Sequence, residues 1–155
     1  MTTTTAIVAL PEASGGWREI ELSQPRAWAE HPDAFSSRVA FAAAHVVADP
    51  RGENVPGAPA AIDWETTLAF RQHLFRYGLG VAEAMDTAQR NMGLDWPATQ
   101  ELITRSSALA QEHGARIASG AGTDQLLAPA GSLQEVTRAY LEQVEFVETA
   151  GSQVI

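Results

Sequence analysis

Two residue types are missing from the 155-residue chain, and both absences restrict its chemistry. It contains no cysteine, which excludes disulfides, thiolate nucleophiles and thiolate metal ligands. It also contains no lysine, because all 10 basic residues are arginine. The arginine guanidinium stays protonated, so apart from the terminal amine no group of this chain can form a Schiff base with a carbonyl substrate.

Basic charge and long hydrophobic runs are also scarce. The 10 basic residues face 19 acidic ones, which gives a net charge of -9. We expect no nucleic-acid partner, because binding to phosphates depends on clustered Lys and Arg. The longest apolar runs, such as VAFAAAHVVA at 39–48, fall well short of the roughly 20 residues of a membrane span. The first residues lack the basic segment of a secretory signal. We therefore expect a cytoplasmic protein with no membrane partner.

A pattern of strand, polar loop, amphipathic helix and glycine occurs three times along the chain. Strands are predicted at 38–47, at 80–86 and in the stretch ARIASGAG that starts at 115. Apolar strand positions recur about 40 residues apart, which leaves room for one crossover helix between successive strands. These positions are Val39, Val81, Ile117 and Val154.

Each of the three predicted helices has start or stop signals. The third has the clearest ones, because Ser132 and Glu135 have the spacing of a capping box. Its apolar residues Leu133, Val136, Tyr140, Val144 and Val147 share one face. Asp63 is a further predicted N-cap, Pro97 is predicted to occupy the first helical position, and Gly78 and Gly114 are predicted to end helices.

Apolar strands alternating with helices predict an α/β fold with a parallel sheet. Periodicity leaves two architectures open, a doubly wound sheet and part of a TIM (β/α)8 barrel with about three βα units plus the start of strand four. Residues 38–155 form this predicted unit. Residues 1–37 are predicted to be an N-terminal extension, with a hairpin in which AIVAL and WREIEL flank PEASGG, followed by an irregular connector.

Candidate functional residues follow the predicted strands, because ligands of parallel α/β folds meet the loops at the carboxyl ends of the strands. A small-molecule substrate is the partner that such a site would take. The candidates are His45 and Asp49 after the first strand, Glu83, Asp86 and Thr87 with Gln89 and Arg90 behind them after the second, and Ser119, Thr123 and Asp124 after the third.

Glu83 and Asp86 interrupt a strand that should be buried, and a buried carboxylate is costly unless it is paired or ligating. Two interpretations stay open: the carboxylates are hydrogen-bonded by Arg90 or by backbone amides, or they belong to a functional site. His45 is either a hydrogen-bonded core residue or a general base or metal ligand. Together His45, Glu83 and Asp86 have the chemistry of a divalent metal site, although no short ligand motif accompanies them. No organic cofactor is expected.

The stretch SGAGTD at 119–124 offers small residues after a strand. Its amides have the chemistry to cradle a phosphate or carboxylate, and a tight βα turn explains the same glycines. The sequence leaves this choice open.

Several stretches resemble the amino-terminal part of a bacterial dihydrodipicolinate-synthase-like family of largely unknown function. They are RVAFAAAHVVADP, AIDWETTLAFRQHLFRYGLGVAEAMDTAQRNMGLDW, ARIASGAGTDQL and YLEQVEFVETAGSQVI. The resemblance implies a TIM barrel of the N-acetylneuraminate lyase and class I aldolase superfamily. It also implies that GSQVI starts strand four, that the chain is a fragment, and that the catalytic lysine and tyrosine lie on later strands.

That superfamily has a Gly-Thr-Thr-Gly-Glu type motif after its second strand, which binds the substrate carboxylate. The corresponding stretch here is EAMDTAQR, in which Thr87 stands near one of those threonines. The glycines and the second threonine of the motif are absent from this stretch, and Glu83 and Asp86 stand there instead. This difference from the motif favours a polar or metal-assisted ligand other than pyruvate.

We therefore predict a lyase or aldolase acting on a small oxo-acid or sugar-like substrate, with this chain inactive alone. One alternative is a metal-dependent barrel enzyme using His45, Glu83 and Asp86. Another is a non-catalytic half-barrel subunit that self-associates, because an open sheet exposes its edges. The predicted partner is accordingly a second copy or a missing C-terminal half.

Overall fold

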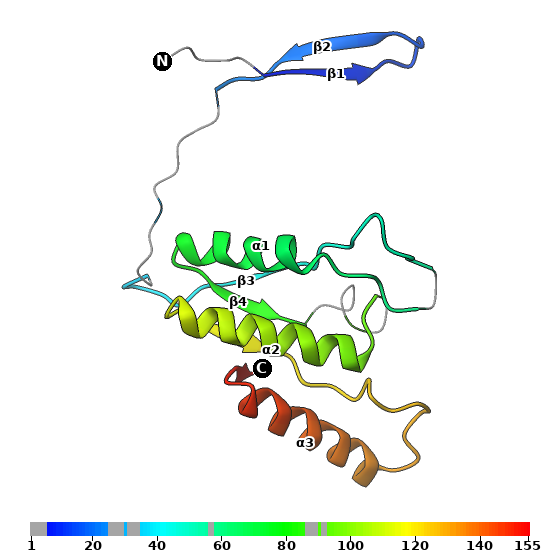
Figure 1. Ribbon diagram of the computed structural model, residues 1–155, viewed down its shortest axis with the longest axis vertical. Helices are drawn as coiled ribbons and strands as arrows, with labels where there is room; N and C mark the ends of the chain where they lie inside the picture. The colour runs from blue at the N-terminus through cyan, green and yellow to red at the C-terminus, as the bar shows by residue number, and fades with distance from the viewer. Residues whose placement is uncertain (1–5, 25–29, 31–34, 56–57, 86–89, 91–92) are drawn as a thin grey trace.

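The computed structural model describes residues 6–24, 30, 35–55, 58–85, 90 and 93–155 of the chain. The described part comprises an antiparallel hairpin and a four-stranded parallel sheet with three helices (Figure 1). Its fold is therefore α/β, as predicted. No helix within these ranges is both long and apolar enough to cross a membrane.

The parallel sheet has the consecutive order β3-β4-β5-β6. The strands are β3 (Phe41–Ala43), β4 (Gly80–Glu83), β5 (Ile117–Ser119) and β6 (Gln153–Val154). The helices between them are α1 (Trp64–Arg76), α2 (Trp96–Glu112) and α3 (Leu133–Thr149). Right-handed crossovers that always step to the next strand in one direction place their helices on the same face of a sheet. Figure 1 shows α1 next to β3 and α2 next to β4.

The predicted register holds in the middle of the sheet. Val81 of β4 pairs with Ile117 of β5, as their spacing indicates. Val39 lies before β3, whose Ala42 is the partner of Val81. Val154 pairs with Ser119, two residues beyond Ile117. The outer strands are thus offset from the predicted row. The interval between two strands in the sequence does not determine how many of its residues belong to the loops, and so it does not determine the register.

The helix caps follow the sequence closely. The side chain of Asp63 accepts a hydrogen bond from the Thr66 N–H at 3.0 Å, and Ser132 Oγ accepts one from the Glu135 N–H at 3.2 Å. The Glu135 carboxylate bonds the Gly131 N–H at 2.8 Å, one residue before the position that a standard capping box uses.

Helix α2 begins one residue earlier than Pro97 indicates. Asp95 is its N-cap and accepts a hydrogen bond from the Ala98 N–H at 2.9 Å, so Pro97 occupies the second helical position. Gly78 and Gly114 follow the ends of α1 and α2 with φ of 72° and 59°, a left-handed conformation that glycine adopts without strain.

The buried face of α3 agrees with the predicted one in part, because Val147 is buried and Val136 and Val144 are half-buried. Ala139, Gln143 and Val147 are its buried residues, whereas Leu133 is 80% exposed and Tyr140 46% exposed. The helix is rotated so that a glutamine, not a tyrosine, faces the protein interior. The polar network described below gives the reason.

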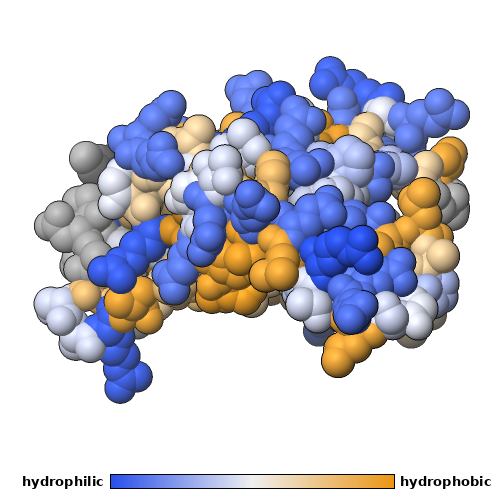
Figure 2. Space-filling view, turned by 90° about the horizontal axis from the view of Figure 1, so that it is seen from below, coloured by the Kyte–Doolittle hydropathy of each residue, from blue (hydrophilic) through white to orange (hydrophobic). Residues whose placement is uncertain are grey.

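Two apolar clusters form the core between the sheet and the helices. One is Ala44, Phe75, Val81, Leu109, Ala110 and Ile117, and the other is Ala84, Leu94, Leu102, Ile103 and Val147. The opposite face of the sheet is more open, since Phe41 and Ala43 are exposed and Ala82 is half-buried. Hydrophobic side chains also gather on the surface that faces downward in Figure 1 (Figure 2).

The predicted N-terminal hairpin is present. Strand β1 (Ile7–Pro11) pairs antiparallel with β2 (Trp17–Glu21), and its turn contains Gly15 with a φ of 85°. Figure 1 shows this hairpin apart from the α/β part of the molecule.

Candidate functional site

Glu83, at the carboxyl end of β4, forms a buried ion pair with Arg71 of α1. Both side chains are fully buried. Arg71 Nε lies 2.6 Å from Glu83 Oε2 and Nη2 lies 2.7 Å from Oε1, while the Ala84 N–H donates to Oε1 at 3.1 Å. This bidentate geometry is the strong form of an arginine–carboxylate contact. Both carboxylate oxygens are therefore engaged within the protein.

The guanidinium of Arg71 connects α1 to β4, to α2 and to the segment that follows β3. Besides Glu83 it donates to Ser106 Oγ of α2 at 3.1 Å, to the Thr67 carbonyl at 2.8 Å and to the His45 carbonyl at 3.1 Å. These bonds compensate the cost of burying the charge. Arg71 lies between Thr67 and Phe75 at helical spacing, and the structure buries all three on one face of α1.

A second buried arginine joins the loops that follow β4 and β5. Arg90 Nε donates to Asp124 Oδ2 at 3.2 Å, and its Nη2 contacts Asp124 Oδ1. Its Nη1 donates to the carbonyls of Gly120 at 2.8 Å and Ala84 at 3.4 Å. Arg90 thus pairs with Asp124 and not with Glu83, and it links Ala84 at the end of β4 to Gly120 and Asp124 after β5.

Gln143 of α3 completes this network, which we call the Arg90 network. Its Oε1 accepts from the Gly122 N–H at 2.7 Å and from Arg90 Nη2. Its Nε2 donates to Asp124 Oδ1 at 2.9 Å and to Gln125 Oε1 at 2.6 Å. The side chain is fully buried. A satisfied network of this kind rigidifies its surroundings, so the loop after β5 is fixed to α3.

The Arg90 network also controls the ionisation of Asp124. Burial by itself raises the pKa of this carboxyl group, but hydrogen bonds from Arg90 and Gln143 and the charge of Arg90 outweigh it and hold the pKa below its ordinary value. Asp124 is consequently an anion at neutral pH and is neutralised by Arg90.

The two loops border a hollow of about 500 Å³ at the carboxyl edge of the sheet. This carboxyl-edge hollow is lined by residues that include Met85, Gly120, Thr123, Asp124, Tyr140 and Ile155. The loop after β4 starts at Ala84, whose φ of 49° is uncommon for a residue other than glycine. A Cβ at Gly120 would lie 3.0 Å from the Ala84 carbonyl oxygen, so glycine permits the close approach of the two loops.

Comparison with protein families gives one match. The profile of the family described as Protein of unknown function (DUF993) matches residues 8–155. The chain belongs to this family. The DUF993 match runs from β1 through β6, so it includes both the hairpin and the sheet. No curated protein matches the chain.

In this DUF993 chain the predicted site residues fall into three groups. Thr123 and Asp124 line the carboxyl-edge hollow, and Arg90 lines it with them. Asp86, Thr87 and Gln89 lie outside the described residues. The remaining candidates, His45, Asp49, Glu83 and Ser119, do not line the hollow.

Each of these four has another environment. The side chain of His45 is exposed, while Ser119 is buried with its Oγ 2.7 Å from Ser152 Oγ. Asp49 bonds the Arg51 N–H at 2.9 Å, and this backbone hydrogen bond is the main cause of its lowered pKa. Among the described residues no three His, Asp or Glu side chains are grouped to hold a metal ion.

The amides of SGAGTD are largely used by the protein itself. Gly120 N–H donates to the Glu83 carbonyl at 3.1 Å, Ala121 N–H to the Ile155 carbonyl at 3.4 Å, and Gly122 N–H to Gln143. Helix α3 begins only at Leu133. A structural turn accounts for these glycines better than an anion cradle. The sequence did not predict Arg71 and Gln143 as site residues, because both lie on helices and the candidates were expected at the carboxyl ends of strands.

Proposed function

We propose that the chain forms the first half of a (β/α)8-barrel enzyme of the lyase or aldolase type, whose substrate binds in the carboxyl-edge hollow. One observation carries this proposal: the Arg90 network links Ala84, after β4, to Gly120 and Gly122, after the neighbouring parallel strand β5, and these residues border a polar hollow. Parallel α/β folds place their ligands at this edge. The resemblance to dihydrodipicolinate-synthase-like proteins supplies the reaction class.

The sheet topology supports a barrel. Four parallel strands follow one another in chain order, the order found around a (β/α)8 barrel. Closure would give β3 and β6 a second neighbour each. It would also turn the open face with Phe41, Ala43 and Ala82 into a packed interior.

The chemistry of the hollow favours a hydroxylated substrate. Arg90 is neutralised by Asp124, and its donors are used by Asp124, Gln143 and two carbonyls. Arg90 is therefore poorly suited to bind the carboxylate of an oxo-acid, so the contacts of this hollow with such a substrate are expected at its hydroxyl groups. The side chains of Thr123 and Tyr140 also line the hollow, and both carry hydroxyl groups that can bond a sugar-like oxo compound.

The catalytic amine of such an enzyme would lie outside this chain, because the chain has no lysine. No organic cofactor is part of the proposal. A divalent cation stays a prediction from the sequence, and Glu83 is a poor ligand for it because Arg71 holds both of its oxygens. Calorimetric titration with Mg²⁺, Mn²⁺ and Zn²⁺ tests that prediction.

The substrate class can be tested with the full chain by saturation-transfer NMR. Pyruvate, hydroxylated oxo-acids and simple sugars would be compared on the native chain and on Thr123→Val. The matched control is Thr104→Val, an equal change at an exposed position of α2. We expect signals from the hydroxylated oxo compounds that weaken in Thr123→Val and persist in Thr104→Val. Absence of binding by every compound, or equal behaviour of the two variants, would contradict the proposal.

A further inference from the structure

The N-terminal hairpin exposes an apolar surface that two strands alone do not stabilise. All residues of β1 and all but one of β2 are exposed. Ile7 is 63% exposed and Trp17 71% exposed. An isolated two-stranded hairpin is at best marginally stable in water and needs a surface to pack against.

One face of this hairpin combines apolar and acidic side chains. Residues directly opposite each other in the register share a face. Trp17, Glu19 and Glu21 therefore lie on the same face as their partners, which are Pro11, Ala9 and Ile7. This Trp17 face contains two carboxylates and no basic side chain.

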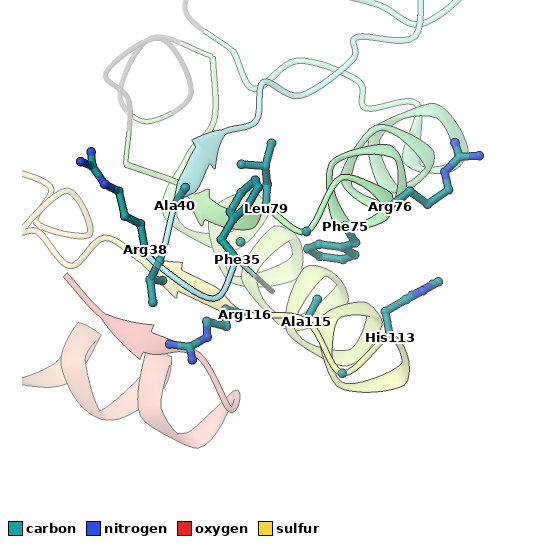
Figure 3. A pocket seen from close by; sticks show the side chains of 13 residues that line it. Phe35, Arg38, Ala40, Phe75, Arg76, Leu79, His113, Ala115 and Arg116 are labelled. Atoms are coloured by element: carbon teal, nitrogen blue, oxygen red, sulfur yellow. The ribbon is translucent and has the colours of Figure 1, made fainter. Parts of the chain in front are cut away.

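A second unpartnered feature lies at the opposite edge of the sheet from the carboxyl-edge hollow. It is a pocket of about 300 Å³, which we call the amino-edge pocket (Figure 3). Phe35, Phe75, Leu79 and Ala115 contribute apolar side chains to it. Its volume is at the lower limit of ligand pockets, enough for one aromatic side chain.

The rim of the amino-edge pocket is basic. Arg38, Arg76, Arg116 and His113 border it, although the chain as a whole carries a charge of -9. In the described part of the chain none of these arginines has an ion pair. Figure 3 shows Arg38 and Arg116 on one side of the aromatic pair Phe35 and Phe75, and Arg76 on the other.

Helix ends explain only part of this charge. Arg76 ends α1 and His113 caps α2, and a cation is favourable at such a position. Arg38 and Arg116 precede strands β3 and β5, where no helix dipole calls for a cation. Since none of the ion pairs among the described residues involves them, their positive charge suits an acidic partner.

We propose that the Trp17 face of the hairpin docks into the amino-edge pocket of a second copy of this chain. Trp17 is the anchor for the apolar centre, and Glu19 and Glu21 face the basic rim. The Trp17 face and the amino-edge pocket each contain apolar side chains, and the carboxylates of the face are opposite in charge to the arginines of the rim. The hairpin lies apart from the α/β part of its own chain (Figure 1), and the occupant that we propose for the pocket is therefore the hairpin of a second copy. Reciprocal exchange of two hairpins gives a closed dimer with two identical contacts.

Sedimentation equilibrium of the full chain tests the proposal with three variants. Trp17→Ala removes the anchor, and Arg116→Glu reverses a charge of the rim. Arg138→Glu is the matched control, because Arg138 is exposed on α3 and does not line the pocket. We expect a dimer whose dissociation constant rises on the order of tenfold or more in the first two variants, as for interface anchors. The control should dimerise like the native chain. Circular dichroism verifies that each variant is folded.

Mixing Trp17→Ala with Arg116→Glu distinguishes a second copy from the chain's own pocket. The mixed pair retains one intact hairpin and one intact pocket, so a heterodimer should form where neither variant dimerises alone. A native chain that stays monomeric at high concentration would overturn the proposal. A dimer that is indifferent to both variants would overturn it equally, since it would use another surface such as the open sheet face.

Discussion

Replacing Glu83 by leucine would leave the Arg71 charge buried without its counter-ion. Both side chains have no solvent access, so water cannot replace the lost carboxylate. Arg71 would keep only Ser106 Oγ and carbonyl partners, including those of Thr67 and His45. Removing one partner of a buried ion pair typically costs about 3–5 kcal/mol.

Such a loss is a large fraction of the total, because domains are stable by only about 5–15 kcal/mol. For a chain of this size, 1 kcal/mol corresponds to a shift in melting temperature of roughly 2–4 °C. We therefore expect Glu83→Leu to melt roughly 6–20 °C below the native chain. The double variant Arg71→Met with Glu83→Leu removes both charges, and we expect it to recover most of this loss.

Urea denaturation followed by circular dichroism measures these differences. The exposed pair Arg105–Glu101 on α2 is the matched control, since Glu101→Leu should cost less than about 1 kcal/mol. A cost below about 1 kcal/mol for Glu83→Leu, or a double variant no more stable than the single one, would refute the structural role assigned to Glu83.

Three further predictions concern the Arg90 network and the missing lysine. Gln143→Met removes hydrogen-bond partners of the Gly122 N–H and of Asp124, so it should lower the free energy of unfolding by about 2–4 kcal/mol and speed amide exchange at 120–126. Gln134→Met, at an exposed position of the same helix, is the control and should change neither quantity. Asp124 has a lowered pKa in the folded chain, so its stabilising effect is complete above the ordinary value of 3.8 and is lost as the pH falls through the lowered one. Asp124→Asn should flatten the fall in unfolding free energy in that acid range, and equal slopes for both proteins would contradict this. Incubation with pyruvate and cyanoborohydride should add mass at the amino terminus at most, because the chain has no lysine. Adducts elsewhere in the chain would contradict the proposal that the catalytic amine lies outside it.

The elements of the fold were predictable because their signals are local. Asp63 and Ser132 cap helices through residues only three positions away, and Gly78 and Gly114 end helices through their own backbone conformation. Alternation of apolar strands with helices was enough to predict a parallel sheet.

The side-chain partners were less predictable because they depend on packing between distant segments. Glu83 binds Arg71 of the preceding helix, and Arg90 binds Asp124 across 34 positions of the chain. The rotation of α3 is a similar case. Hydrophobic periodicity placed Tyr140 inward, whereas the buried side chain at this part of the helix is Gln143, which makes four hydrogen bonds to the loop after β5 and to Arg90.

Chemical-shift mapping tests most directly whether the carboxyl-edge hollow is the ligand site. The ¹⁵N-labelled full chain would be titrated with a hydroxylated oxo-acid, and amide shifts would be followed by residue. We predict that the shifts gather at Met85 and at Gly120–Asp124. Shifts that gather instead at Gly78 and Gly114 beside the amino-edge pocket, or a spectrum that does not change, would contradict the proposed site.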